Sequence, residues 1–310
     1  MAVARAPHVI FNLPNITIRY VIQNITSDTD TCIAWLQQNG LLPSVMFCDC
    51  GSQCSVANHR VVSDGKSWKC RSRHCRKRIS IRHGTFFENS NMKLTTLLEL
   101  LYWWANDTPQ QVVQRELDIK TWETTVNWYS NCRDICTAVI LDNLQPIGGP
   151  GVEVEIDESK FMHRKYHRGQ YVEGKWYLGM VERLNAGNCI LVQCPGNRRD
   201  AATLLPLIQH NVLPGTTIIS DQWAAYNQLN NLGYVHQTVN HSLFFRDPNT
   251  GVHSNTIEGT WAHAKAKFRT MHGTSQGMHE SYLSEFVWRR KFRDRSFEHL
   301  ISQISEYYDV

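Results

Sequence analysis

The sequence predicts a mixed α/β domain preceded by two smaller modules, one rich in cysteine and one helical. Three observations carry this prediction. Five of the ten cysteines fall within residues 48–75, residues 92–145 follow a helical period, and residues beyond 152 alternate short apolar strands with helices. The stretch 146–151, rich in proline and glycine, separates the third part from the first two. A length of 310 residues fits this organisation.

Composition narrows the class of protein. Apolar residues make up 42% and charged residues 19%, which excludes global disorder, collagen and coiled-coil arrays. No run approaches the roughly 18 apolar residues of a membrane helix, and residues 1–12 lack the pattern of a secretory signal. We therefore expect a soluble intracellular protein without a membrane partner. The net charge of +4 is too small to indicate nucleic acid, but residues 66–82 hold eight Lys or Arg and no acid.

Residues 1–44 form an N-terminal segment to which we assign no function. Strands are expected at 9–13 and 17–22, and a helix at 26–39. Residues 45–90 contain the cysteine cluster and the basic run. Because a reducing compartment seldom uses cysteines for disulfides, metal binding is the first interpretation of the cluster. A turn signal at residues 63–65 predicts two short hairpins with a metal-binding knuckle at each end.

Residues 91–145 are predicted to form a helix-turn-helix. One apolar stripe at helical spacing marks a first helix, and it comprises Leu94, Leu97, Leu98, Leu101 and Trp104. Thr108 as N-cap, Pro109 as first residue and Gln111 as capping partner predict a short second helix. A third helix from 121 to about 141 would be the recognition helix, whose first side chains usually meet base edges. The candidate DNA contacts there are Lys120, Thr121, Glu123, Thr124 and Asn127.

Three acids in the α/β part occupy places where a carboxylate is costly without a purpose. Asp157 ends the alternating strand 152–157, Asp221 follows the apolar strand 216–220, and Glu258 lies in the first turn of a helix that begins near 255. Such acids can converge and bind two divalent ions for phosphoryl transfer, and Mg²⁺ suits carboxylate ligands. Lys265, two helical turns after Glu258, could hold a phosphate.

Each of these acids also has a plainer interpretation. A single Asp after a strand is often a turn or helix-cap residue, and the helix dipole alone explains Glu258. Further strands are predicted at 176–181, 189–194 and 235–239. Helices are predicted at 200–211 and 223–229.

Several blocks of this part resemble Merlin-type DNA transposases, eukaryotic relatives of a group of bacterial insertion-sequence transposases. The blocks are VEIDESKF (154–161), residues 164–166 and 168–169, VEGKW (172–176), ISDQWAAY (219–226), VNHS (239–242), NTIEGTW (255–261) and YLSEFVWR (282–289). The resemblance extends from about residue 48 to 290.

The resemblance implies a ribonuclease-H-like DDE domain at 152–296, followed by a C-terminal tail at 297–310. The implied catalytic residues are Asp157, Asp221, Glu258 and Lys265, with two Mg²⁺ or Mn²⁺ ions. The implied activity is nicking at transposon ends and strand transfer by the freed 3′-hydroxyl. Double-stranded DNA is then the partner, as transposon end and as target. A homodimer is expected by analogy, located in the nucleus of a eukaryotic host or the cytoplasm of a bacterial one.

The resemblance also implies a zinc ribbon at 45–90. Its first knuckle is usually Cys-x-x-Cys-Gly, but Phe47 stands at the first cysteine position and Cys48 comes one place late. The implied structural Zn²⁺ ligands are Cys48, Cys50, Cys70 and Cys75, with Cys54 as an alternative ligand. Loss of the metal stays open. Six neighbouring basic residues are candidates for phosphate contact: Arg71, Arg73, Arg76, Lys77, Arg78 and Arg82.

Two other functions compete with an active transposase. The irregular knuckle favours a catalytically inactive or domesticated DNA-binding derivative, whereas the intact acids argue against one. A ribonuclease-H-like nuclease acting on RNA hybrids is weaker, because a helix-turn-helix suggests duplex DNA. His253, near Glu258, is a further candidate for the site.

Overall fold

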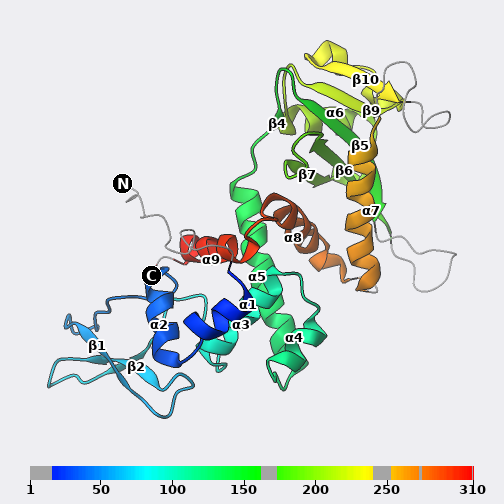
Figure 1. Cartoon of the computed structure of the whole chain (residues 1–310). Helices are drawn as coiled ribbons and strands as arrows, with labels where there is room; N and C mark the ends of the chain where they lie inside the picture. Colours follow the sequence, from blue (N-terminus) through cyan, green and yellow to red (C-terminus); the bar gives the residue numbers. More distant parts are fainter. Residues whose placement is uncertain (1–15, 162–172, 240–252, 272–273, 309) are drawn as a thin grey trace. The chain divides into compact units, whose positions relative to one another are not determined.

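The computed structural model describes residues 16–161, 173–239, 253–271, 274–308 and 310 (Figure 1). The chain divides into two compact units, one made of the residues up to Ile135 together with Asp294–Val310, the other of Cys136–Arg293. In the described ranges, no helix is long and apolar enough to cross a membrane. The sequence blocks at 164–166, 168–169 and 240–242, and the strand expected at 9–13, lie outside the described residues.

The first unit begins its sheet with the cysteine-rich segment. Strands β1 (Cys54–Asn58), β2 (Lys66–Cys70) and β3 (Arg78–Ser80) form an antiparallel sheet in the order β1-β2-β3. The predicted turn at residues 63–65 lies between β1 and β2, where Gly65 has a φ of +63° that favours glycine. The expected hairpins are therefore present.

Helices make up the rest of the first unit. They are α1 (Ile18–Tyr20), the π-helical η2 (Val21–Ile25), α2 (Thr29–Gln38), α3 (Leu94–Ala105), α4 (Gln110–Glu116), the part of α5 (Trp122–Asp142) up to Ile135, and α9 (Ser296–Tyr307). The five residues of the predicted apolar stripe on α3 are all fully buried. Helix α3 contacts α2 and α9, so the stripe gives this unit its core.

Three expectations about the chain's organisation were wrong. Residues 17–22 are helical, because Thr17 Oγ1 caps the backbone N–H of Tyr20 and the next apolar residues are buried at helical spacing. Helix α4 begins after Pro109, which is its N-cap in place of Thr108. Residues 297–307 belong to α9, which lies within the first unit and is not a tail. The two compact units divide after Ile135, inside α5; the domain boundary at 146–151 stays a prediction.

The second unit contains a mixed five-stranded sheet in the order β10-β9-β5-β6-β7. Strands β5 (Glu153–Phe161), β6 (Lys175–Glu182) and β7 (Cys189–Gln193) pair antiparallel in sequence. Strands β9 (Thr217–Asp221) and β10 (Val235–Val239) add on the other side of β5 in parallel. The short strands β4 (Ile147–Gly148) and β8 (Val212–Leu213) pair separately.

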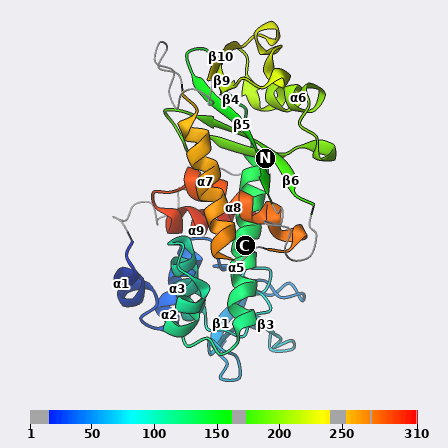
Figure 2. The ribbon, with the colours of Figure 1, turned by 90° about the vertical axis from the view of Figure 1, so that its right-hand side faces the viewer.

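Helices cover both faces of this sheet. Helix α6 (Ala201–Asn211) lies on one face, and α7 (Asn255–Thr270) lies on the other (Figures 1 and 2). Helix α8 (His279–Lys291) packs with α7. Val154 and Ile156 of β5 pack toward α6, whereas Phe161 packs with Ile257 and Trp261 of α7. Short 3₁₀ turns at Ala224–Tyr226 and Leu229–Leu232 stand where a helix at 223–229 was expected.

Candidate active site and cysteine cluster

Asp157 and Asp221 lie side by side on neighbouring parallel strands. The ladder between β5 and β9 pairs Glu155 with Ile219, and each aspartate follows two residues later on its strand. Because side chains two residues apart share a face and parallel strands lie about 4.8 Å apart, the two carboxylates face the same way next to one another. The face is the one covered by α7. The alternation read in residues 152–157 agrees with the face that Asp157 takes on β5.

Helix α7 brings Glu258 to the same face, and Gly179 makes room for it. Gly179 of β6 lies opposite Asp157 in the antiparallel ladder. A Cβ atom at Gly179 would lie 2.5 Å from Cζ2 of Trp261 and 2.8 Å from Cδ1 of Ile257, both on α7. Only a residue without a side chain allows this approach. Gly179 was not identified from the sequence.

Replacing Gly179 with alanine is expected to push α7 from the sheet and reduce the free energy of unfolding by about 1–3 kcal/mol. The matched control is Gly259→Ala in α7, where a Cβ atom meets nothing within 4 Å. That change should stabilise by about 0.5–1 kcal/mol, because alanine is the better helix former. Urea denaturation measures both, and equal effects of the two substitutions would contradict this packing.

Glu155 holds the first turn of α7 in place. Its side chain is fully buried, and its carboxylate accepts hydrogen bonds from the backbone N–H of Ile257 (2.9 Å) and the hydroxyl of Thr256 (3.1 Å). Arg183 Nε donates to the same carboxylate at 2.8 Å, and its Nη2 donates to the carbonyl of His253 at 2.8 Å. A carboxylate at a helix N-terminus satisfies unpaired N–H groups and interacts well with the helix dipole.

The Glu155 contact therefore orients the turn that carries Glu258. The sequence contained a signal for the role of Glu155, because this acid lies two residues before Asp157 on the same face of the strand. His253 serves this anchor as well, since its Nδ1 lies 3.7 Å from Glu155 Oε1.

The charges of the four predicted catalytic residues act on one another. Burial and the carboxylates of Asp221 and Glu258 together raise the pKa of Asp157 to about 7, against the lowering effect of Lys265. Asp221 Oδ1 accepts a hydrogen bond from the backbone N–H of Trp223 at 3.0 Å. Glu258 accepts one from the Ser254 hydroxyl at 3.1 Å. The structure thus brings Asp157, Asp221, Glu258 and Lys265 into one neighbourhood.

This donor set fits a hard divalent cation. The carboxylates of Asp221 and Glu258 lie close enough to Asp157 to raise its pKa, so the three together concentrate negative charge. Mg²⁺ and Mn²⁺ prefer such oxygen ligands. Within the described residues, the oxygen atoms of the three carboxylates do not all lie within 4.8 Å of one another.

Glu158, the residue after Asp157, is a buried acid that was not singled out from the sequence. Its side chain is 5% exposed, and its carboxyl accepts a hydrogen bond from the Tyr226 hydroxyl. Burial raises the pKa of Glu158 to about 8, and the nearby Asp157 and Asp221 act in the same direction. The folded chain therefore favours the neutral carboxyl.

This pKa predicts a loss of stability with rising pH. The unfolded carboxyl ionises near its ordinary value of 4.5, whereas the folded one keeps its proton up to about 8. The stability is therefore complete below pH 4.5 and is lost as the pH rises through 8. Without added divalent cation, Glu158→Gln should lessen the fall in unfolding free energy between pH 5 and 8 by about 2 kcal/mol. Urea denaturation at both pH values checks this, and an equal fall in the variant would contradict it.

The four predicted zinc ligands lie together in the first unit. The Sγ atoms of Cys48, Cys50, Cys70 and Cys75 all lie within 4.8 Å of one another. Two of the S···S distances are 3.6 Å (Cys48–Cys75) and 3.5 Å (Cys50–Cys70). Tetrahedral Zn²⁺ with Zn–S bonds of about 2.3 Å requires S···S distances of about 3.8 Å. The cluster therefore fits the metal.

The irregular Cys-x-Cys knuckle closes through Gly51. Its φ of +79° lets its N–H donate to the carbonyl of Cys48 at 2.8 Å, which turns both cysteines toward the cluster. Hydrogen bonds from Ser52 lower the pKa of Cys50 to about 6 and favour its thiolate form. Cys54, the alternative ligand, lies outside the group of four; it is buried opposite Cys70 in the ladder.

Five of the six basic candidates beside the cysteine cluster are exposed, namely Arg71, Arg73, Arg76, Lys77 and Arg78. The assignment of Arg82 to this surface was wrong. Arg82 is 5% exposed, and its guanidinium donates to Asp64 and to the carbonyls of Ser90 and Met92. Asp64 also accepts from the backbone N–H of Leu94 at 2.9 Å. This buried ion pair therefore ties the β1–β2 turn to the start of α3.

The candidate base contacts lie at the start of α5. Lys120, Thr121, Glu123 and Asn127 are exposed, and Thr124 is half-buried. The hydroxyls of Thr121 and Thr124 lie 2.6 Å apart. Asp118, with a φ of +49°, makes the turn between α4 and α5. Trp128 and Tyr129 are buried, as expected for packing residues, whereas Trp122 is largely exposed.

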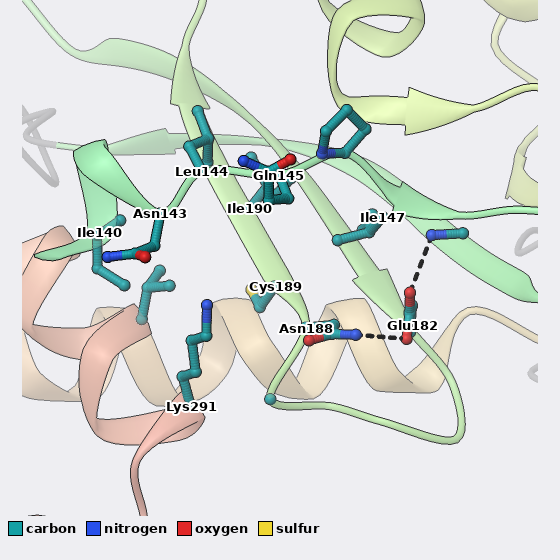
Figure 3. A pocket seen from close by; sticks show the side chains of 14 residues that line it. Ile140, Asn143, Leu144, Gln145, Ile147, Glu182, Asn188, Cys189, Ile190 and Lys291 are labelled. Atoms are coloured by element: carbon teal, nitrogen blue, oxygen red, sulfur yellow. Dashed lines mark hydrogen bonds between the residues drawn. The ribbon is translucent and has the colours of Figure 1, made fainter. Parts of the chain in front are cut away.

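A cavity of about 170 Å³ lies elsewhere in the second unit (Figure 3). The end of α5, residues 143–148, the β6–β7 hairpin and α8 line it, and Lys291 points toward it. Glu182 closes one side by accepting hydrogen bonds from Gly148 N (2.9 Å) and Asn188 Nδ2 (2.8 Å). None of the predicted catalytic residues lines this cavity.

A family model matches most of the second unit, and one relative matches most of the chain. The family model of the ISXO2-like transposase domain matches residues 147–291. An uncharacterized transposase-like protein of Haemophilus influenzae is 33% identical over 89 residues, which are 29% of this chain and 71% of that protein. Male abnormal protein mab-31 of Caenorhabditis elegans is 24% identical over 310 residues, 92% of this chain and 69% of that protein.

Solved structures give weaker likenesses. The HTLV-2 integrase catalytic core domain in complex with magnesium matches 47% of this chain and 87% of that chain, with 11% identity and a TM-score of 0.28. A pre-cleavage Mos1 transpososome matches 69% of this chain and 79% of that chain, with 13% identity and a TM-score of 0.24.

Proposed function

The chain belongs to the ISXO2-like family of insertion-sequence transposases, and from this membership we propose that it is a DDE transposase that cuts and joins DNA. The observation that carries the proposal is the convergence of Asp157, Asp221 and Glu258 from two parallel strands and the facing helix. The reaction is cleavage at transposon ends, followed by attack of the freed 3′-hydroxyl on target DNA.

The sheet supports the ribonuclease-H-like part of the proposal. Counted along the chain, its strands follow the spatial order 5-4-1-2-3, with only the second antiparallel to the first. This is the topology expected for a ribonuclease-H-like domain. The first and fourth strands carry the two aspartates.

Each residue of the site has a role in the proposed chemistry. Asp157, Asp221 and Glu258 would hold two Mg²⁺ or Mn²⁺ ions, which supply an activated nucleophile and stabilise the leaving oxygen. Glu155 keeps Glu258 in place through its hydrogen bonds to the first turn of α7. Lys265 supplies a positive charge near Asp157 and would bind a phosphate oxygen of the strand.

The first unit is proposed to recognise the transposon ends. The cysteine cluster would hold a structural Zn²⁺ and present the five exposed basic residues to phosphates, while the start of α5 would contact bases. A homodimer is proposed because two ends must be brought together. The proposed location is the nucleus in a eukaryotic host and the cytoplasm in a bacterial one. Asp221, Glu258 and Lys265 all act on the charge of Asp157, an arrangement that gives no support to an inactive derivative.

The experiment that tests the function uses the full chain and a labelled duplex that carries a transposon end with its flank. We expect strand cleavage at the junction in Mg²⁺ and joining of the 3′-end to a plasmid. The same duplex with a scrambled end is the control for recognition. Absence of both cleavage and joining at every divalent cation concentration would contradict the proposal.

A further inference from the structure

Two indoles and one guanidinium form a stack that includes Trp223, which follows the end of β9. The guanidinium carbon of Arg199 is 4.4 Å from the centre of the Trp176 ring and 4.7 Å from that of Trp223. Trp223 follows Asp221 by two residues, and its backbone N–H is hydrogen-bonded to the Asp221 carboxylate. The backbone of Trp223 is therefore fixed to one of the acids, whereas Trp176 lies on the sheet face that packs toward α6.

Arg199 has hydrogen-bond donors to offer. Its side chain is 42% exposed, and the nearest carboxylate oxygen, Glu158 Oε2, is 4.0 Å away. In the described part of the chain, its guanidinium donates no hydrogen bond, although a guanidinium carries several N–H donors in one plane. The neighbouring Arg198 is different, because its Nε and Nη2 both donate to Asp200 Oδ2. The two indole rings contact the guanidinium of Arg199, and the N–H groups at the edge of this guanidinium remain available to a ligand.

The surroundings of the stack fit an unpaired nucleotide. Trp223 is 39% exposed, and Lys160 Nζ lies 5.6 Å from the Trp176 ring and adds a second positive charge. Positive charge together with exposed aromatic rings is what binds single-stranded nucleic acid, since bases within a duplex are not free to stack. A fixed guanidinium suits a phosphate, which it can contact with two parallel hydrogen bonds.

We propose that the Trp176–Arg199–Trp223 stack binds an unpaired nucleotide of the DNA strand beside the bond that is cut. Arg199 contacts its phosphate and Trp223 stacks on its base. This proposal rests on the proposed function, because it takes the carboxylate site as the place where DNA reacts. In this proposal, the contacts of Arg199 and Trp223 with the strand position the reacting phosphate.

The test measures binding of short labelled oligonucleotides to the full chain by fluorescence anisotropy, without any requirement for cleavage. Arg199→Lys is expected to raise the Kd for a single strand about tenfold and to leave the Kd for the matching duplex within about twofold. Arg198→Lys is the matched control and should change neither. Trp223→Ala should weaken single-strand binding about tenfold, and Trp223→Phe should retain most of it.

Equal single-strand affinities of the Arg199→Lys and Arg198→Lys proteins would overturn the proposal. So would a parallel loss of duplex binding, which would show general attraction to phosphate. Thermal unfolding of each variant tests whether the stack has only a structural role. In that case both Trp223 variants would melt at a lower temperature and would bind single strands with equal affinity, and this result would also overturn the proposal. A wild-type chain that binds single strands through Arg199 yet cuts no DNA would contradict the proposed function alone.

Discussion

Replacing Asp157 with asparagine is expected to reduce Mg²⁺-dependent strand cleavage by about a thousandfold or more. Removing one preorganised group that stabilises the transition state costs about 10²–10³ in rate, and here the carboxylate would also hold the cation. The fold should remain intact, because the substitution removes a half-buried carboxylate whose pKa is raised by burial and by Asp221. Single-turnover cleavage of end DNA and urea denaturation give the two readouts.

The matched control for this prediction is Glu280→Gln, which removes an exposed carboxylate from the same unit. It should leave the cleavage rate within about twofold, since exposed charges contribute little. Asp157→Asn should also retain duplex binding in a gel-shift assay. Cleavage by Asp157→Asn at the wild-type rate would remove this residue from the catalytic site.

Replacing Cys70 with serine is expected to abolish zinc binding and unfold the cysteine-rich sheet. Binding of structural Zn²⁺ contributes about 10–16 kcal/mol in small zinc modules, so a lost thiolate removes most of the free energy that holds such a module. Zinc content of the purified chain and proteolysis within residues 45–90 report the loss. A chelator should give the same proteolytic pattern in the wild-type chain.

Cys54→Ser is the matched control, because Cys54 is buried in the same sheet but lies outside the group of four. It should keep one zinc per chain and lose only the modest stability of a buried thiol, about 1 kcal/mol. Loss of zinc in the Cys54 variant, with zinc retained in the Cys70 variant, would mean that the ligand set is different.

Local patterns predicted the elements that carry the carboxylates. The alternation in 152–157 defined the faces of β5, and the apolar run before Asp221 marked a buried strand. The register between the two strands is non-local, but the position of each acid on its strand was enough to suggest convergence. Asp157 was expected to end its strand, whereas β5 continues to Phe161 because the alternation of buried residues continues past it. The helical spacing of the α3 stripe was similarly sufficient for that helix.

Non-local contacts explain what the sequence did not reveal. Arg82 looks like its basic neighbours in the sequence, yet Asp64, 18 residues earlier in the chain, forms a buried ion pair with it. The role of Gly179 depends on side chains of α7 about 80 residues later. The cap that Glu155 provides for α7 spans 102 residues. No periodicity within a short window can report such pairs.

The measurement that tests the carboxylate site most directly is Mn²⁺ binding to the zinc-loaded chain, followed by electron paramagnetic resonance. We predict that the wild-type chain binds Mn²⁺ and that Mg²⁺ displaces it. Asp157→Asn and Asp221→Asn should each weaken the affinity at least about tenfold, with Glu280→Gln unchanged. Equal Mn²⁺ affinity in the wild-type chain and both aspartate variants would contradict the assignment of these acids as the metal-binding site.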